Sequence, residues 1–305
     1  PGLPEAAEAE GIDALGYMRK HGAFLIEEAT YGKHEEEGWP TPSGKQEFYS
    51  NSMVEFGYPE HAIPHYRIRS HVHPDNLQGE DEYCLLPNFR LPQHIHSRSA
   101  NAKWLAEIGH RNPLWVHPTD AAKLGVGEGD LLKVETEIGW FIDKVWVTEG
   151  IKPGIIGCSH HIGRWRRKQD SGNRYMTNEV EIEDVGSGRM RMRTVNGVRP
   201  WESDDPDTNR VWWRDGGVHQ NITHAVQPDP ISGAHCWLQK VKITKPSGDE
   251  RYGDVEVDTT KSFEYYKRWN QMAKERETHP RGERRPLWMN RPLPPSKDHW
   301  FVDLG

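Results

Sequence analysis

The chain has 305 residues, of which 28% are charged and 34% hydrophobic, and its formal net charge is −7. This length suffices for one large domain or two smaller ones, and the net negative charge argues against a general nucleic-acid binder. No apolar run is long enough for a membrane span, and no signal peptide is recognised.

The first 80 residues predict few regular elements. Residues 1–10 are small and acidic and indicate a solvated lead-in, whereas residues 13–21 favour a short helix. The Pro and Gly of residues 41–45 predict a turn that leads into a strand at 46–50. The chain begins with Pro1 rather than Met, so we expect a longer precursor that was trimmed or divided, and the localisation stays open.

The central part alternates short apolar strands with short helices, which predicts a mainly β domain. Helices are expected at 101–108, with Asn101 as the N-cap, and at 118–124, between Pro118 and Gly125. The expected strands lie at 83–87, 114–117, 131–137, 140–148, 155–159 and 236–243.

Two long polar segments interrupt or follow these strands. Residues 164–217 indicate an insertion with two Gly- and Arg-rich stretches. Residues 259–274 favour one helix, and residues 279–305, rich in Pro, Arg and Trp, predict an extended tail that docks on another surface.

The three cysteines lie far apart and form no CxxC pair. This spacing predicts neither a zinc ribbon nor an iron–sulfur framework, and buried free thiols are favoured over disulfides.

The first candidate binding loop follows the strand at 83–87. Arginine forks suit phosphate, small donors supplement them, and a helix start favours an anion. The loop therefore predicts a pyrophosphate site, and the alternative is an exposed polar loop. Its candidate ligands are Arg90, His96, Ser97, Arg98, Ser99 and Asn101.

The glycines of residues 124–130 follow a helix and precede a strand, the reverse of the order in a dinucleotide-binding fingerprint, so they indicate a tight turn. Residues 157–165 follow a strand end, where ligand-contacting loops tend to lie. There His160, His161, Arg164 and Trp165, with Gly163 between them, can stack against and hydrogen-bond a flat heterocycle. Direct metal ligation by histidines is not favoured, because no carboxylate spacing accompanies them.

A further candidate segment spans residues 219–223, followed by 229–233. Gln220 and Asn221 offer paired donors and acceptors for the edge of a heterocycle. The alternatives are a plain turn before the last strand and, for residues 221–223, a glycosylation sequon.

Taken together and in this order, the segments over residues 10–245 resemble the dinucleotide-binding region of the dimethyl-sulfoxide-reductase family of molybdopterin oxidoreductases. Residues 41–50 are similar to the stretch before that region, residues 90–99 to its first cofactor loop, and residues 124–130 to its Gly-Asp turn. Residues 116–122 resemble its strand-to-helix step, with His117 in place of the usual Asn and Asp120 retained. Residues 221–233 resemble its closing pterin loop.

The resemblance implies a six-stranded double-psi β-barrel, similar to that of aspartate decarboxylase, and a bis-molybdopterin guanine dinucleotide cofactor with molybdenum or tungsten. It implies a domain at 81–245 with an insertion near 166–217, preceded by a lead-in at 1–80 that ends a previous domain and followed by the docking tail at 246–305. His160 and His161 are then the catalytic candidates, as proton relays.

The resemblance also implies what lies outside the chain. The family's metal ligand and iron–sulfur segment precede this region, so we expect the remainder of a catalytic subunit and an iron–sulfur electron-transfer subunit as partners. The reaction would be oxygen-atom transfer or proton and electron transfer, as in anaerobic respiration, and the substrate stays open. The alternative is a non-catalytic double-psi barrel that has lost the cofactor and serves in binding or assembly. A self-cleaving decarboxylase is disfavoured because Gly186-Ser187 lacks the strand context.

Overall fold

The computed structural model describes residues 2–24, 31–41, 43–51, 62–64, 72, 76–87, 91–94, 102–169, 177–198, 204, 206, 214–226, 235, 237–271, 273–275 and 284–286. The chain divides into two compact units, one of residues 1–65 with 292–305 and one of residues 66–291.

The first unit contains three short helices, α1 (Leu3–Ala9), α2 (Ala14–His21) and α3 (Lys33–Glu37). α2 confirms the predicted helix, because Asp13 caps it through the Gly16 amide at 2.6 Å and Gly22 ends it in a left-handed conformation. The strand predicted at 46–50 is wrong, since these residues form a bend within irregular chain instead.

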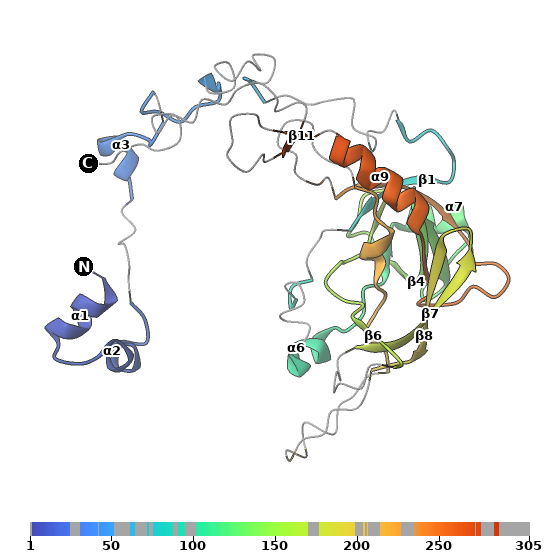
Figure 1. Cartoon of the computed structure of the whole chain (residues 1–305), viewed down its shortest axis with the longest axis horizontal. Coiled ribbons are helices and arrows are strands. Elements are labelled where there is room, and N and C mark those ends of the chain that lie inside the picture. Colours follow the sequence, from blue (N-terminus) through green and yellow to red (C-terminus); the bar gives the residue numbers. More distant parts are fainter. Residues whose placement is uncertain are drawn as a thin grey trace. The chain divides into compact units, whose positions relative to one another are not determined.

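The second unit is built on a closed six-stranded barrel (Figure 1). Around the ring the order is β2-β5-β1-β9-β3-β4, and β4 pairs with β2 to close it. The neighbours β1–β5 and β2–β4 are parallel and the other pairs antiparallel. The predicted mainly β barrel is thus confirmed, whereas its double-psi crossing stays a prediction. The strands are β1 (Glu82–Leu86), β2 (Leu114–Val116), β3 (Leu131–Glu135), β4 (Gly139–Val147), β5 (Ile155–Gly157) and β9 (Gln239–Thr244).

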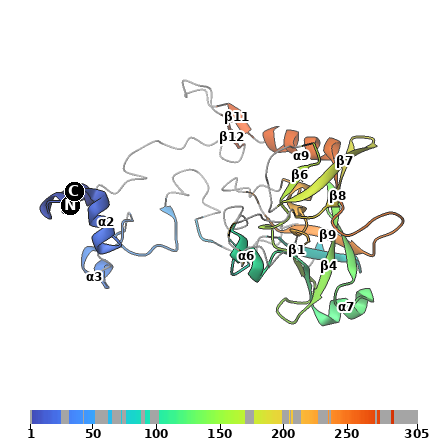
Figure 2. The same ribbon diagram turned by 90° about the horizontal axis from the view of Figure 1, so that it is seen from below.

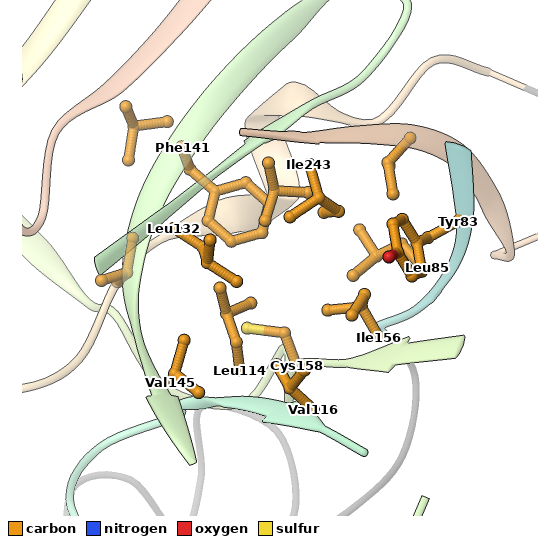
Figure 3. Packing of buried hydrophobic residues seen from close by; sticks show 14 of the residues in the cluster. Tyr83, Leu85, Leu114, Val116, Leu132, Phe141, Val145, Ile156, Cys158 and Ile243 are labelled. Carbon is orange, nitrogen blue, oxygen red and sulfur yellow. The ribbon is translucent and has the colours of Figure 1, made fainter. Parts of the chain in front are cut away.

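Alternating side chains from every barrel strand fill the interior (Figure 3). On β4, Phe141 and Val145 point inward and are at most 1% exposed, and on β3 Leu132 and Val134 do the same. One or two inward side chains from each strand fill the core. This packing fixes the register, since a one-residue slip would turn a strand's inward side chains to the outside.

Helix α7 (Pro118–Leu124) has the predicted start and stop. His117 caps it by accepting a hydrogen bond from the Thr119 amide at 3.2 Å, and Pro118 occupies its first turn. Gly125, with φ of 65°, ends it. The preceding helix, α6 (Lys103–Ile108), begins after Ala102 rather than at the predicted Asn101, which lies outside the described residues.

The predicted insertion contributes three strands to the sheet. These are β6 (Trp165–Arg167), β7 (Asn178–Gly186) and β8 (Arg189–Asn196), joined to the barrel through β10 (Val255–Asp258). β10 pairs with β8 on one side and with the first half of β4 on the other. The segment after residue 245 is therefore not wholly an extended tail, because Val255 is fully buried in the core.

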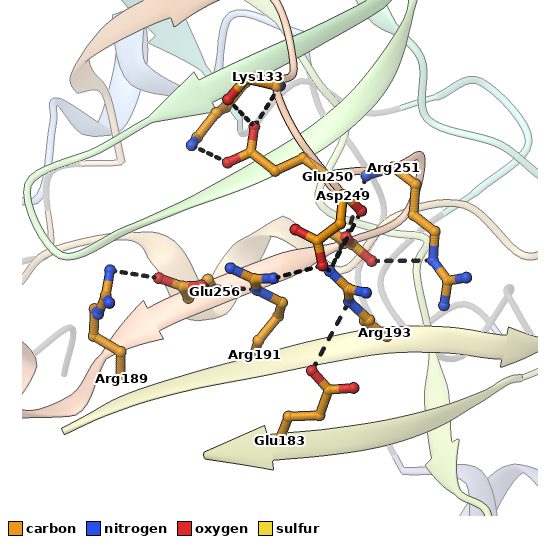
Figure 4. Close-up of polar contacts among 11 residues, drawn as sticks. Lys133, Glu183, Arg189, Arg191, Arg193, Asp249, Glu250, Arg251 and Glu256 are labelled. Atoms are coloured by element: carbon orange, nitrogen blue, oxygen red, sulfur yellow. Dashed lines mark hydrogen bonds and ion pairs between the residues drawn. The ribbon is translucent and has the colours of Figure 1, made fainter. Parts of the chain in front are cut away.

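Ion pairs hold this added hairpin against β10 (Figure 4). Glu256, only 3% exposed, accepts from Arg191 Nε at 2.9 Å and lies 3.4 Å from Arg189 Nη1. Further along β8, Arg193 binds Asp249 at 2.5 Å and approaches Asp254 at 3.5 Å.

Helix α9 (Thr259–Gln271) follows β10 directly and confirms the predicted helix at 259–274, with an end three residues earlier. It contacts β8 and β10, and Figure 2 shows it on the side of the barrel away from α7. Two short strands follow, β11 (Ala273–Glu275) and β12 (Arg284–Pro286), which pair with each other. Within the described residues, no helix is long and apolar enough to cross a bilayer.

Candidate functional site

Two barrel strands deliver their following loops to the same end of the barrel. β1 and β5 are parallel neighbours, so their carboxyl ends lie side by side. The Cys158 amide donates to Leu86 O at 3.1 Å, and His160 Nδ1 lies 2.9 Å from Pro87 O. Residues 158–163, called the histidine segment from here on, carry both candidate catalytic histidines. They are thereby fixed against the start of the predicted phosphate loop.

The two histidines are oriented by main-chain carbonyls. His161, 2% exposed, places Nδ1 at 3.0 Å from His94 O, and its ring meets the His160 ring edge-to-face at 4.2 Å between centroids. A carbonyl only accepts hydrogen bonds, so Nδ1 carries a proton in both rings. In the neutral tautomer each Nε2 is therefore a proton acceptor.

A third segment, residues 216–224, lies at the same end of the barrel and is called the η3 segment because it contains the short helix η3 (Gln220–Thr223). Gln220, 1% exposed, donates from Nε2 to Cys158 O at 2.6 Å, and Asn221 donates from Nδ2 to His160 O at 3.3 Å. Helix η3 places both amides on the histidine segment. The structure thus brings together His160, His161, Gln220 and Asn221, which the sequence proposed from separate motifs.

Arg164 and Trp165 continue from this segment into β6. Arg164 O accepts from the Asn178 amide at 2.8 Å, and the Trp165 ring lies 6.3 Å from the His219 ring. Gly163, with φ of 89°, packs so closely on Val218 that a Cβ atom would overlap the Val218 carbonyl. Its place in the predicted site is therefore explained by a close approach of two chain segments.

His224, His235 and Trp237, which the sequence did not single out, lie next to these residues. The His160 and Trp237 rings are 5.3 Å apart, and His235 lies 5.2 Å from the same indole. Burial, followed by the neighbouring histidines, lowers the pKa of His224 to about 3, and burial also lowers the pKa of His219. Burial thus favours the neutral form of the His219 and His224 rings.

Beneath the histidine segment the barrel interior is closed by Cys158, which is fully buried and in no disulfide. Its Sγ lies 3.2 Å from Asn112 O and 4.0 Å from Asp143 Oδ2. Burial raises the pKa of the Cys158 thiol and that of the Asp143 carboxyl. The Cys158 thiol therefore stays protonated at neutral pH, and Cys158 is a structural thiol rather than a metal ligand.

Two buried oxygen atoms at this end fit a bound polar group. In the part of the chain that the structure describes, Ser159 Oγ and Asn221 Oδ1 are buried and have no hydrogen-bond partner. Buried polar atoms normally find a partner. Together with the amide donors and aromatic rings around them, these atoms fit the hydrogen-bonding edge of a flat heterocycle.

Two predicted residues lie elsewhere. β2 runs antiparallel to β5, so α7, which follows β2, lies at the start of β5, opposite the histidine segment. Asp120, 7% exposed, accepts there from the Gly154 amide at 2.7 Å, and His117 is occupied as the helix cap. The structure therefore shows stabilising contacts for His117 and Asp120 and does not bring them to the other candidates.

The remaining predicted ligands, Arg90, His96, Ser97, Arg98, Ser99 and Asn101, lie outside the described residues. Across the described ranges, no group of three or more His, Cys, Asp or Glu side chains is arranged to hold a metal ion.

Sequence reasoning missed the buried amides that support the site. Asn178 donates to Gly217 O and accepts from the Gly216 amide, both at 2.8 Å, and Asn112 contacts the same segment. The Gly216-Gly217 pair was the available indication of a close approach, whereas nothing in the sequence around Asn112 distinguishes it from a surface residue.

Residues 85–235 match the model of the family described as the molydopterin dinucleotide binding domain. The chain contains a molybdopterin-dinucleotide-binding domain. This finding confirms the resemblance to the dinucleotide-binding region of the dimethyl-sulfoxide-reductase family, and the convergent loops described above belong to this domain.

Curated relatives of this molybdopterin-binding domain are subunits of reductases and a dehydroxylase. The chain is 24% identical over 197 residues to the arsenate respiratory reductase molybdopterin-containing subunit ArrA of Chrysiogenes arsenatis, covering 55% of this chain and 22% of that protein. It is 27% identical over 232 residues to the dopamine dehydroxylase of Eggerthella lenta, covering 73% and 19%. The chain thus spans about a fifth of the length of these relatives.

A further relative is the thiosulfate reductase molybdopterin-containing subunit PhsA of Salmonella typhimurium, which is 32% identical over 127 residues, covering 42% of this chain and 15% of that protein. Among solved structures, the acetylene hydratase of Pelobacter acetylenicus aligns with a TM-score of 0.47 and 20% identity, covering 78% of this chain and 28% of that one.

Proposed function

We propose that this chain forms the cofactor-binding part of the catalytic unit of a molybdenum or tungsten oxidoreductase and helps to hold a bis-molybdopterin guanine dinucleotide. The observation that carries the proposal is the meeting of three loop segments at one end of the barrel, within residues matched by the dinucleotide-binding family. Reductases among the relatives support oxygen-atom transfer or proton and electron transfer as the reaction class.

In this proposal the histidine segment and η3 contact the pterin. Asn221 and Gln220 orient its polar edge, with Ser159 Oγ and Asn221 Oδ1 as further partners, and Trp165 and Arg164 border it. The phosphates are assigned to the loop after β1, through Arg90, Arg98 and the small donors His96, Ser97, Ser99 and Asn101. When bound, the cofactor supplies the redox chemistry, and the protein supplies orientation and electrostatics.

His160 and His161 are proposed as proton carriers. Their Nδ1 atoms donate to carbonyls, so the Nε2 atoms take up and release protons without a change of ring orientation.

The rest of the assembly is proposed from the family. The metal ligand and an iron–sulfur cluster belong to other parts of the catalytic subunit, and an iron–sulfur subunit exchanges electrons with it. The domain proposed at 81–245 is extended to residue 258 because β10 completes the sheet. Residues 1–80 then end the preceding domain, and the tail beyond α9 docks on another surface.

The cofactor role is tested by changing one pterin contact in the complete protein. Asn221→Ala removes both the His160 O contact and the acceptor Oδ1, so we expect about a tenfold or larger increase in the rate of pterin release, which corresponds to about 1.4 kcal/mol. The matched control is Asn196→Ala, which removes an exposed amide bonded to Glu179 on the hairpin.

Pterin fluorescence after denaturation gives the content of each variant. Equal release from both variants would contradict the assigned contact. Purified protein without pterin, guanine nucleotide or metal would favour the alternative, a non-catalytic barrel used in binding or assembly.

A further inference from the structure

A buried carboxamide lies between the histidine segment and the η3 segment. Asn112, 1% exposed, lies two residues before β2 and is thus attached directly to the barrel wall. Its Nδ2 donates to Ser159 O at 2.8 Å and to Val218 O at 2.9 Å, and its Oδ1 accepts from the Val218 amide at 2.8 Å. One side chain thus binds two main-chain segments, which lie 47 and 106 residues from it in sequence.

The contacts of Asn112 use its hydrogen-bonding capacity in a way that few other side chains reproduce. Both amide protons and the carbonyl oxygen are engaged, and the Asn112 main-chain carbonyl also accepts from Cys158 Sγ at 3.2 Å. An aliphatic side chain would leave two carbonyls and one amide without these partners, and an aspartate would place an acceptor where two donors are needed.

Glycines on both segments make this arrangement possible. Gly217, with φ of 80°, has no room for a Cβ atom, which would lie 2.6 Å from Ile162 Cγ2 and overlap Asn112 Oδ1. The Gly163 amide donates to Gly216 O at 2.8 Å, which joins the two segments a second time. The segments therefore form one packed unit around Asn112.

We propose that Asn112 is a positioning residue for the cofactor site. Its side chain holds the histidine segment and the η3 segment in a fixed position relative to each other and to the barrel wall. This inference rests on the proposed function. Through Ser159 and Val218, Asn112 sets where His160 and Gln220 lie relative to each other, although its own carboxamide is engaged within the protein and does not contact the cofactor.

The test compares Asn112→Ala and the nearly isosteric Asn112→Asp in the complete protein. Both lose the two donors, whereas only the first also loses volume. The control is Ile243→Ala, a core truncation on β9 away from the loops, used to match the loss in melting temperature. The readouts are hydrogen exchange of the Gly163 amide, which does not bond Asn112, and the rate of pterin release.

We expect both Asn112 variants to raise each rate by about tenfold or more, with the control within about twofold of the wild type. The proposal is overturned if either variant matches the control in either readout, because the effect is then one of general stability or of packing volume. If the wild-type protein holds no pterin, the proposed function fails, whereas Gly163 exchange still decides whether Asn112 joins the two segments.

Discussion

At the residue scale, the site depends on positions where main chain meets main chain. Gly163 has a positive φ and lies against the Val218 carbonyl, whereas Gly154 has a similar φ of 81° and open space, with no atom within 4 Å, where a Cβ atom would lie. The two glycines therefore separate the effect of backbone conformation from that of a steric clash.

We expect Gly154→Ala to cost about 1–2 kcal/mol of stability from the left-handed conformation alone. Gly163→Ala should cost at least about 1 kcal/mol more, because main chain rather than a flexible side chain must move. Denaturant unfolding of the two variants measures the difference. Equal losses would show that the histidine segment and the Val218 segment are not in firm contact.

A second prediction at this scale concerns pH. Burial, then neighbouring histidines, holds the pKa of His224 at about 3 in the folded protein, below the usual value of about 6.5 for an exposed ring. Below pH ~6.5 the unfolded chain binds a proton that the folded chain does not, so this histidine lowers stability as the pH falls toward 3.

His224→Gln removes this group. Its stability should fall by about 2 kcal/mol less than that of the wild type between pH 7 and pH 5, since each pH unit contributes at most about 1.4 kcal/mol. Unfolding curves at a series of pH values give the comparison. Parallel pH profiles for the two proteins would contradict a buried, neutral His224.

At the element scale, the hairpin of β7 and β8 is attached to the barrel through one strand and a set of ion pairs. Glu256 of β10 binds Arg189 and Arg191 of β8 and is 3% exposed, whereas Glu183 lies 4.0 Å from Arg193 and is 46% exposed. We therefore expect the buried Glu256 pairs to contribute more to the free energy of unfolding than the exposed Glu183 pair.

We expect Glu256→Gln to cost about 1–3 kcal/mol, because it leaves the largely buried guanidinium group of Arg191 without its buried anion. Glu183→Gln should cost less than about 0.5 kcal/mol. The measurement is unfolding free energy together with hydrogen exchange of the Met192 amide region in β8. A larger effect from Glu183→Gln would contradict the assignment of Glu256 as the anchor.

The sequence correctly predicted the elements whose capping residues or apolar alternation agree with their burial in the fold. Pro118 and Gly125 bound α7 as expected, and alternating apolar residues located β3 and β4. Alternation did not reveal that Val255 belongs to the sheet, because β10 is only four residues long and its pairing with β4 is non-local. Residues 46–50 have a strand-like composition but no strand partner among the described residues.

At the scale of the whole molecule, β10 is an integral strand of the barrel-containing unit although it follows the last barrel strand. It pairs with the first residues of β4 on the edge opposite β3 and carries β8 on its own other side. A chain that stops after Lys245 would expose the core around Phe141 and leave the hairpin without its partner strand.

We therefore expect truncation after Lys245 to abolish cooperative unfolding, whereas truncation after Gln271, which retains β10 and α9, should preserve it. Circular dichroism during thermal unfolding distinguishes the two. A cooperative transition for the shorter chain would show that β10 is dispensable.

The candidate site was predictable as a set of loops but not as a geometry. Polar motifs after strand ends indicated His160, His161 and Asn221, and the structure joins them through His160 O. Asp120 was selected by resemblance, yet it lies at the other end of β5 and binds Gly154. Nothing in the sequence indicated the role of Asn112, because its hydrogen-bond partners lie 47 and 106 residues away.

The proposed role of this domain is to hold a pterin dinucleotide at a molybdenum or tungsten centre of a larger catalytic unit. Analysis of the purified complete protein for metal, pterin and guanine nucleotide tests this role without assuming a substrate. We expect about two guanine nucleotides and two pterins for each molybdenum or tungsten atom, as a bis-dinucleotide cofactor requires. Protein that is folded and free of all three would contradict the proposed role.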